Sequence, residues 1–239
     1  MKIAREKLIK FYDEDVREEG RGSHVSSITS LWGEDLILGI LQSYWQKEEN
    51  ATGEILSYLC NTGNKSGYRL DAWILKTNAS KKQTLYQVEV KNWSAYSIGG
   101  EHLPITASDA DLRNRSQEYW NYYFGSTNIP DKNVSKVMLP MKKPPGYEAH
   151  PAVPLLCFWF LIADEKRTHF SMKRYADGSR VHVFSASSYL RSLKDSHIDI
   201  FMPTAERRLR LLFELVSLDH FRTPSVSSGK SSGPSPSNV

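Results

Sequence analysis

The chain contains little cysteine and no long hydrophobic segment, and each absence excludes a class of protein. Of its 239 residues only two are cysteines, Cys60 and Cys157. Both lie in apolar, strand-like runs and match neither a disulfide framework nor a zinc-ligand spacing, so we expect reduced, buried thiols in a cytoplasmic protein. The longest apolar run, residues 154–163, is about half of the roughly 20 residues that span a bilayer. The N-terminus also lacks the apolar stretch of a signal peptide.

A large excess of charge of one sign is also missing. Lysine and arginine number 31 against 27 acidic residues, a formal net charge of +4, which permits an anionic partner without requiring one. The composition, 40% hydrophobic and 24% charged, is that of a globular protein. We find no Walker A loop, no Gly-x-Ser-x-Gly, no His-Glu-x-x-His and no dinucleotide-binding glycine motif. ATPase, serine hydrolase, zinc protease and NAD chemistry therefore have no sequence support.

Composition along the chain divides it into three parts. Residues 1–25 carry dense but balanced charge, which favours a solvated, helical N-terminal arm. Residues 26–222 alternate helical and strand patterns and are expected to form a single α/β domain. Residues 223–239 are dominated by serine, glycine and proline, so this tail is expected to be disordered.

Within the central part, hydrophobic periodicity predicts a mixed β-sheet flanked by helices. Apolar residues at three-to-four spacing predict a helix from about residue 26 to residue 45, and a capping-box-like start predicts a second helix over 108–124. Turn-forming residues separate three runs, which favours an antiparallel meander of strands at 54–60, 68–76 and 84–93. Further strands are expected at 154–163 and 180–185, and further helices at 187–193 and 204–218. The buried face of the last helix is expected to contain Leu209, Leu212, Phe213 and Val216.

Charged residues interrupt two of the apolar strands. Asp71 lies within one of them, and Glu89 and Lys91 lie within the next. Because side chains alternate along a strand, Glu89 and Lys91 project to the same side, and a suitable register places Asp71 beside Glu89. Two close carboxylates repel unless a cation lies between them, and hard oxygen ligands select Mg²⁺ or Mn²⁺. A nearby ammonium can hold or activate a water molecule that attacks a phosphate.

This arrangement resembles the PD-(D/E)XK nuclease superfamily, whose fold is called restriction-endonuclease-like. The family pattern is an acidic residue in one strand followed by acidic-x-lysine in the next, and here it consists of Asp71 and Glu89-Val90-Lys91. Leu70 stands where the family pattern has proline. The order of helix, meander, helix and strand over residues 26–163 is also similar to the family core. The resemblance implies Mg²⁺-dependent hydrolysis of DNA phosphodiester bonds, with Mn²⁺ as a possible substitute.

The resemblance also implies roles for individual residues. Asp71, Glu89 and the Val90 carbonyl would bind the metal, and Lys91 would position or activate the water. Glu34, on the first helix, is similar in position to a glutamate that joins the metal site in many members. A solvated carboxylate on the helix surface is the alternative for Glu34.

Four further residues are candidates for substrate binding. Gln87 shares the face of Glu89, and Asn92 follows the motif directly. Arg113 and Gln117 are four residues apart on one face of the second predicted helix, where they could face phosphates. Structural hydrogen bonding for Gln87 and a solvated helix face for the other pair are the alternatives.

The sequence thus predicts a metal-dependent DNA endonuclease, of a restriction, defence or repair system. A homodimer or a partner protein is expected to supply specificity. Two alternatives stay open. One is a non-catalytic nucleic-acid-binding or scaffolding protein of the same fold, and the other is an unrelated α/β domain in which Asp71, Glu89 and Lys91 form structural ion pairs. Phosphodiesterase chemistry alone does not identify a pathway.

Overall fold

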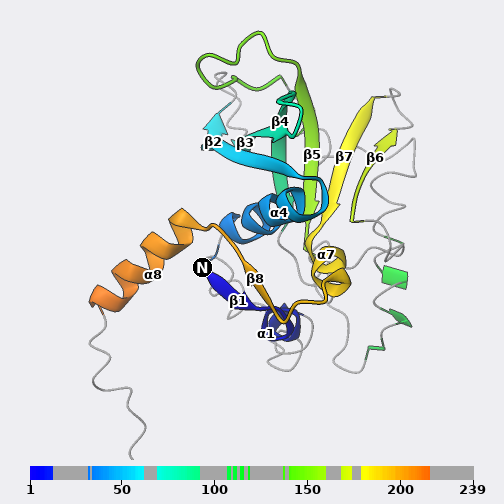
Figure 1. The fold of residues 1–239 in the computed structure, drawn as a ribbon, viewed down its shortest axis with the longest axis vertical. Coiled ribbons are helices and arrows are strands. Elements are labelled where there is room, and N and C mark those ends of the chain that lie inside the picture. The colour runs from blue at the N-terminus through cyan, green and yellow to red at the C-terminus, as the bar shows by residue number, and fades with distance from the viewer. Residues whose placement is uncertain are drawn as a thin grey trace, which may run out of the picture.

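A mixed six-stranded β-sheet is the centre of the fold, which is known from a computed structural model (Figure 1). The structure describes residues 1–12, 32, 34–61, 69–91, 107–108, 110–111, 114–115, 118, 137, 140–159, 168–173 and 179–215. The strand order is β2-β3-β4-β5-β7-β6. The first three strands form an antiparallel meander, β4, β5 and β7 are parallel, and β6 pairs antiparallel with β7. The expected mixed α/β architecture is therefore present.

The strands follow the sequence pattern closely where apolar and polar residues alternate. Their bounds are β2 Ala51–Asn61, β3 Arg69–Asn78, β4 Gln83–Lys91, β5 Ala152–Phe158, β6 His169–Lys173 and β7 Arg180–Ser185. The predicted strand at 180–185 has the observed bounds, and the meander is observed as expected. Strand β6 was not predicted, because five residues with two hydrophobic side chains give too weak a signal.

The turn between β3 and β4 fixes the register of these two strands. The Asn78 side-chain oxygen accepts hydrogen bonds from the Lys82 N–H and from the Ser80 hydroxyl, each at 2.8 Å. Lys81 adopts a positive φ of 61° there. The turn holds Thr77 opposite Gln83, so every later residue pair of the two strands is determined.

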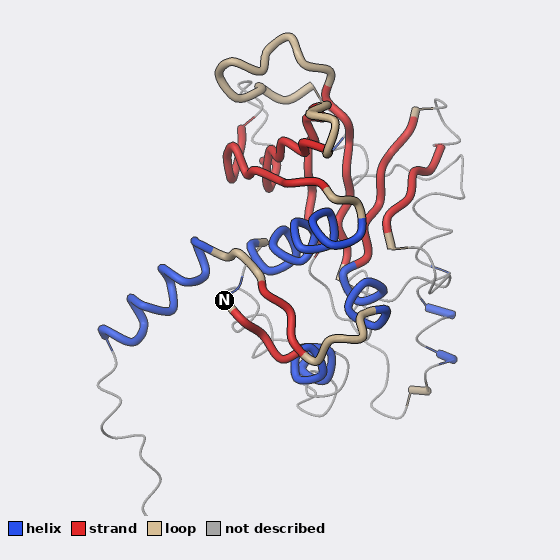
Figure 2. Tube along the Cα trace, viewed as in Figure 1, coloured by secondary structure: helices blue, strands red, loops and turns tan. Residues whose placement is uncertain are grey.

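Helix α4, Asp35–Glu48, covers one face of the sheet (Figure 2). Its apolar residues pack on the β3 and β4 side chains of that face, which include Ile74, Tyr86 and Val88. The helix α7, Ala186–Ser192, lies next to it. On the opposite face of the sheet, Trp73 and Gln87 are buried as well, and the described residues near them include Val137 and Met141.

The first twelve residues differ from the expected solvated arm. Strand β1, Lys2–Ala4, pairs antiparallel with β8, His197–Asp199, in a separate two-stranded sheet. Helix α1, Arg5–Lys10, follows β1 and buries Leu8. Tyr12 is fully buried and stacks on Trp159, with ring centroids 3.9 Å apart. A helix is therefore present as expected, but the prediction that these residues are solvated was wrong for residues 1–12, because dense charge masked their short apolar stripe. Residues 13–25 lie outside the described residues.

The last helix, α8 (Pro203–Leu215), also differs from the expectation. It begins at the predicted place, but it projects away from the rest of the molecule in Figure 1. Leu212 is 40% exposed and Phe213 is 55% exposed, so the predicted buried face is largely uncovered. Periodicity predicts which residues of a helix share a face, and it does not predict whether another element covers them. Val216 and the tail at 223–239 lie outside the described residues.

Two further features were expected from the sequence. Cys157 is fully buried and makes no disulfide bond, and burial, with a contribution from the Asp71 charge, raises the pKa of its thiol well above the usual value. Nothing is described for the side chain of Cys60. No helix in the described part of the chain is long and apolar enough to span a bilayer.

Candidate functional site

The register of β3 and β4 brings Asp71 and Glu89 to the same place. Trp73 pairs with Gln87 and Ala72 pairs with Val88, and continuing this register by one residue would set Asp71 opposite Glu89. Near this point a carboxylate oxygen of Asp71 accepts a hydrogen bond from the Val90 N–H at 2.6 Å. The adjacency of the two acidic residues therefore follows from the alternation in the sequence and from the turn at Asn78.

Glu89 and Lys91 form a buried ion pair on the face of β4 opposite α4. The Lys91 ammonium lies 2.6 Å from a Glu89 carboxylate oxygen. The side chain of Glu89 is 1% exposed and that of Lys91 is 15% exposed. A buried carboxylate is costly without a partner, so the lysine compensates the charge of Glu89 in this environment. Their location on one face agrees with strand alternation.

The donor atoms at this site are of the kind that Mg²⁺ and Mn²⁺ prefer. Two carboxylates and the carbonyl of Val90 are hard oxygen ligands, and Mg²⁺ usually keeps several water molecules beside one or two protein carboxylates. One Asp71 oxygen is already engaged with the Val90 N–H. In the described part of the chain, no group of three or more histidine, cysteine or acidic side chains is arranged to hold a metal ion. The chemistry of the donor set fits Mg²⁺, with most of the coordination left to water.

At the start of α4, two adjacent acidic residues behave differently. Glu34 occupies the N-cap position of α4, makes no side-chain capping hydrogen bond and is half-buried. Its neighbour Asp35 is 4% exposed, and its carboxylate accepts a hydrogen bond from the Ala205 N–H of α8 at 2.8 Å. Of the two, Asp35 therefore has the defined structural role, as a cap on another helix.

Gln87 makes a buried contact on the same face as Glu89. Its side-chain amide donates a hydrogen bond to the Val137 carbonyl at 2.7 Å, and the residue is 4% exposed. The neighbouring Trp73 donates from its indole nitrogen to the Lys142 carbonyl at 3.1 Å. These contacts join Val137 and Lys142 to the sheet, and they favour the structural alternative for Gln87.

Three of the predicted substrate-binding residues, Asn92, Arg113 and Gln117, lie outside the described residues. The predicted start of the helix that contains Arg113 and Gln117 is supported by the structure. The Asp111 carboxylate accepts hydrogen bonds from the Ser108 N–H at 2.8 Å and from the Ser108 hydroxyl at 2.7 Å, which is the capping-box arrangement.

A second polar cluster lies where α4 ends against β3, β6 and β7, and sequence analysis did not identify it. Glu49 contacts the Lys76 ammonium and lies 3.0 Å from Nδ1 of His169. Burial raises the pKa of Glu49, but hydrogen bonds from His169 and Lys76 outweigh it and lower the pKa to about 2. The ring of His182 lies 5.5 Å from that of His169. No spacing along the chain could reveal this cluster, because its members are far apart in the sequence.

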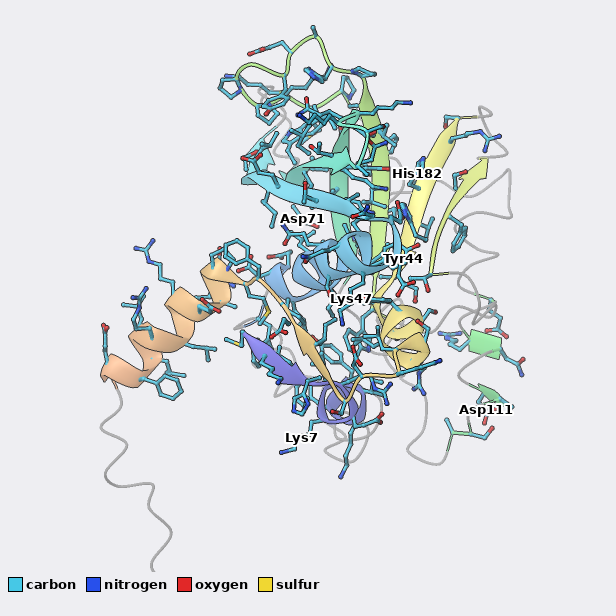
Figure 3. The ribbon with its side chains drawn as sticks, viewed as in Figure 1. Lys7, Tyr44, Lys47, Asp71, Asp111 and His182 are labelled. Atoms are coloured by element: carbon cyan, nitrogen blue, oxygen red, sulfur yellow. The ribbon has the colours of Figure 1, made fainter. Side chains whose placement is uncertain are left out.

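The two clusters are separate in space. Figure 3 shows Asp71 in the meander, and Tyr44 and His182 near the junction of α4 and β7. Burial, followed by the charge of Glu49, raises the pKa of Tyr44 to about 12. Burial and the same charge raise the pKa of Tyr86 to about 12. Both phenols are therefore neutral near pH 7.

No protein-family model matches the chain, and no curated protein or solved structure is significantly similar to it.

Proposed function

We propose that the protein is a metal-dependent nuclease that hydrolyses DNA phosphodiester bonds at the site of Asp71, Glu89 and Lys91. The observation that carries the proposal is the buried Glu89–Lys91 pair at 2.6 Å, with Asp71 on the neighbouring strand. A carboxylate pair and a lysine at one point of a sheet are the groups that phosphodiester hydrolysis with a divalent cation requires. The D…ExK pattern adds support through its resemblance to the PD-(D/E)XK superfamily.

Each residue has a distinct part in the proposed reaction. Asp71, Glu89 and the carbonyl of Val90 would hold Mg²⁺, which supplies Lewis-acid stabilisation of the charge that develops on the phosphate. Lys91 would orient the attacking water and stabilise the negative charge that develops on the phosphate in the transition state. Because Asp71 accepts the N–H of Val90, it also helps to hold the backbone of the residue whose carbonyl is proposed to face the cation.

A structural role is the competing explanation, and one observation favours it. Lys91 already neutralises Glu89 without any cation, as a stable ion pair in a sheet would. A nucleic-acid-binding or scaffolding protein of the same fold would keep this pair and have no cleavage activity. The two explanations differ in what a divalent metal does to the protein, and this difference can be measured.

The test is cleavage of supercoiled plasmid and of single-stranded DNA and RNA in Mg²⁺, Mn²⁺ or EDTA. We expect metal-dependent cleavage by the wild type and a loss of about 100-fold or more in Lys91→Ala, the range typical of removing a group that stabilises transition-state charge. The matched control is Lys82→Ala, which removes an exposed lysine from the turn before β4.

Two further variants separate catalysis from structure. Glu89→Gln and Asp71→Asn should weaken Mn²⁺ binding while the thermal unfolding transition stays cooperative. If the folded wild type binds no Mn²⁺ or Mg²⁺, the catalytic proposal is wrong and the ion pair is structural. Equal cleavage by wild type and Lys91→Ala would remove the lysine from the mechanism.

A further inference from the structure

Two histidines lie together on the face of the sheet that α4 covers. In the β6–β7 pairing, Ser171 is opposite His182 and His169 is opposite Phe184. Alternation along each strand therefore puts His169 and His182 on the same face as diagonal neighbours. Their ring centroids are 5.5 Å apart.

The two ring nitrogens of His169 have different surroundings: one faces a carboxylate and the other is buried. Nδ1 is 3.0 Å from a carboxylate oxygen of Glu49, and the side chain is 9% exposed. Nε2 is buried, and among the described residues it has no hydrogen-bond partner. A neutral imidazole that donates from Nδ1 carries a lone pair on Nε2. A buried lone pair without a donor is a position that a cation can fill.

We propose that His169 and His182 bind a first-row transition-metal ion of the Zn²⁺ type, at a site distinct from Asp71 and Glu89. Nε2 of His169 and one ring nitrogen of His182 would be the protein ligands. Two imidazoles on one tetrahedral Zn²⁺, with Zn–N distances of about 2.0–2.1 Å, have ring centroids roughly 5 Å apart. The observed separation of 5.5 Å is close to this spacing.

The residues around the pair agree with this assignment. A metal-bound histidine usually donates its other ring N–H to a carboxylate, and Glu49 is in that position for His169. Imidazole ligands favour Zn²⁺ over Mg²⁺, whereas the oxygen ligands at Asp71 favour the reverse.

Water must supply the remaining coordination positions, since the described residues form no group of three or more metal-binding side chains. His182 is only half-buried, and it therefore gives access to solvent. A site with two protein ligands and water binds its ion reversibly, so the expected ion is exchangeable and is removed by chelators.

The test is calorimetric titration of the metal-free full chain with Zn²⁺, which should show one site. We expect His182→Gln and His169→Gln each to weaken the affinity at least about tenfold. Glu49→Gln should weaken it by about 10- to 100-fold, the usual effect of losing an outer-shell partner. The matched controls are His150→Gln and His197→Gln, which change histidines on the loop before β5 and on β8 and should leave the affinity unchanged.

His182→Gln is the decisive variant, because in the described part of the chain the His182 side chain makes no hydrogen bond, whereas His169→Gln alters the contact with Glu49. Circular dichroism and thermal unfolding establish that each variant is folded. Absence of Zn²⁺ binding by the wild type, or unchanged affinity in folded His182→Gln, overturns the proposal. So does a loss of Zn²⁺ affinity in Glu89→Gln with none in His182→Gln, since the ion would then occupy the other site.

Discussion

Glu49 connects three elements through one carboxylate. It lies at the end of α4 and interacts with Lys76 of β3 and His169 of β6. Glu49 is partly buried, so its ion pairs are less screened by water than those at the surface. Its pKa of about 2 means that the folded protein favours the charged form of this carboxyl. Protonation of Glu49 would therefore weaken the junction of the helix with both sides of the sheet.

The stability of the folded protein therefore depends on pH. A carboxylate with a folded-state pKa below its usual 4.5 contributes stability above that pH, and the contribution disappears as the pH falls from about 4.5 to about 2. We expect urea midpoints of the wild type to fall over this range. Glu49→Gln should be less stable at pH 7 and lose less of its stability on acidification. Parallel pH profiles for the two proteins would contradict this prediction.

At the same scale, the sequence predicted the candidate site better than it predicted the Glu49 cluster. Glu89 and Lys91 are two positions apart in one strand, so alternation alone places them together. Predicting that Asp71 lies near them required only a short turn and one register of β3 with β4. Glu49, His169 and His182 meet only after α4 has packed on the completed sheet, and no local pattern encodes that packing.

At the scale of elements, α8 depends on α4 for its start. Asp35 of α4 accepts the N–H of Ala205, one of the first-turn donors that the helix cannot satisfy itself. The two segments also approach closely beside this contact, since a Cβ added at Gly39 would lie 2.1 Å from an Ile200 side-chain carbon. The base of α8 is therefore held firmly, while Leu212 and Phe213 further along stay exposed.

The capping contact predicts a specific loss of stability. Asp35→Ala removes the acceptor and should cost about 1–2 kcal/mol, the usual value for a helix cap. Asp35→Asn keeps an acceptor oxygen and should cost less. Equilibrium urea unfolding measures both, and hydrogen exchange in the first turn of α8 reports whether the loss is local. Equal stability of Asp35→Ala and the wild type would show that the cap contributes nothing.

Elements with a clear hydrophobic pattern were predictable even when they are only six or seven residues long, and three-residue or strongly charged ones were not. Strand β7 was predicted with its observed bounds, and α7 within one residue at each end. Strands β1 and β8 have three residues each, too few for any alternation to be detected. The sequence does not reveal which element packs against each surface. It therefore does not predict whether an apolar face, such as that of α8, is covered.

At the scale of the whole molecule, the N-terminal residues belong to the folded structure. The Arg5 N–H donates to the Ser196 carbonyl at 2.9 Å, and β1 pairs with β8 over its full length. Tyr12 adds a fully buried ring against Trp159. These contacts join the beginning of the chain to the layer beneath α4.

Deletion of residues 1–12 should consequently destabilise the protein strongly. The deletion uncovers Trp159 and the apolar side of β8, and loss of a single large buried aromatic costs about 3–5 kcal/mol. Tyr12→Ala in the full chain is the more conservative variant and should lower the melting temperature by several degrees. A melting temperature unchanged by the deletion would support the solvated arm that the charge pattern predicted.

The pairing of β1 with β8 also has a consequence for the order in which the protein folds during synthesis. Lys2 is among the first residues made, yet its partner is Asp199. At about 5–20 residues per second, a ribosome needs on the order of 10–40 seconds to make the chain between them. Strand β1 therefore stays unpaired with β8 during that time. This is the interval in which a chaperone can bind it, and slow codons would lengthen the interval.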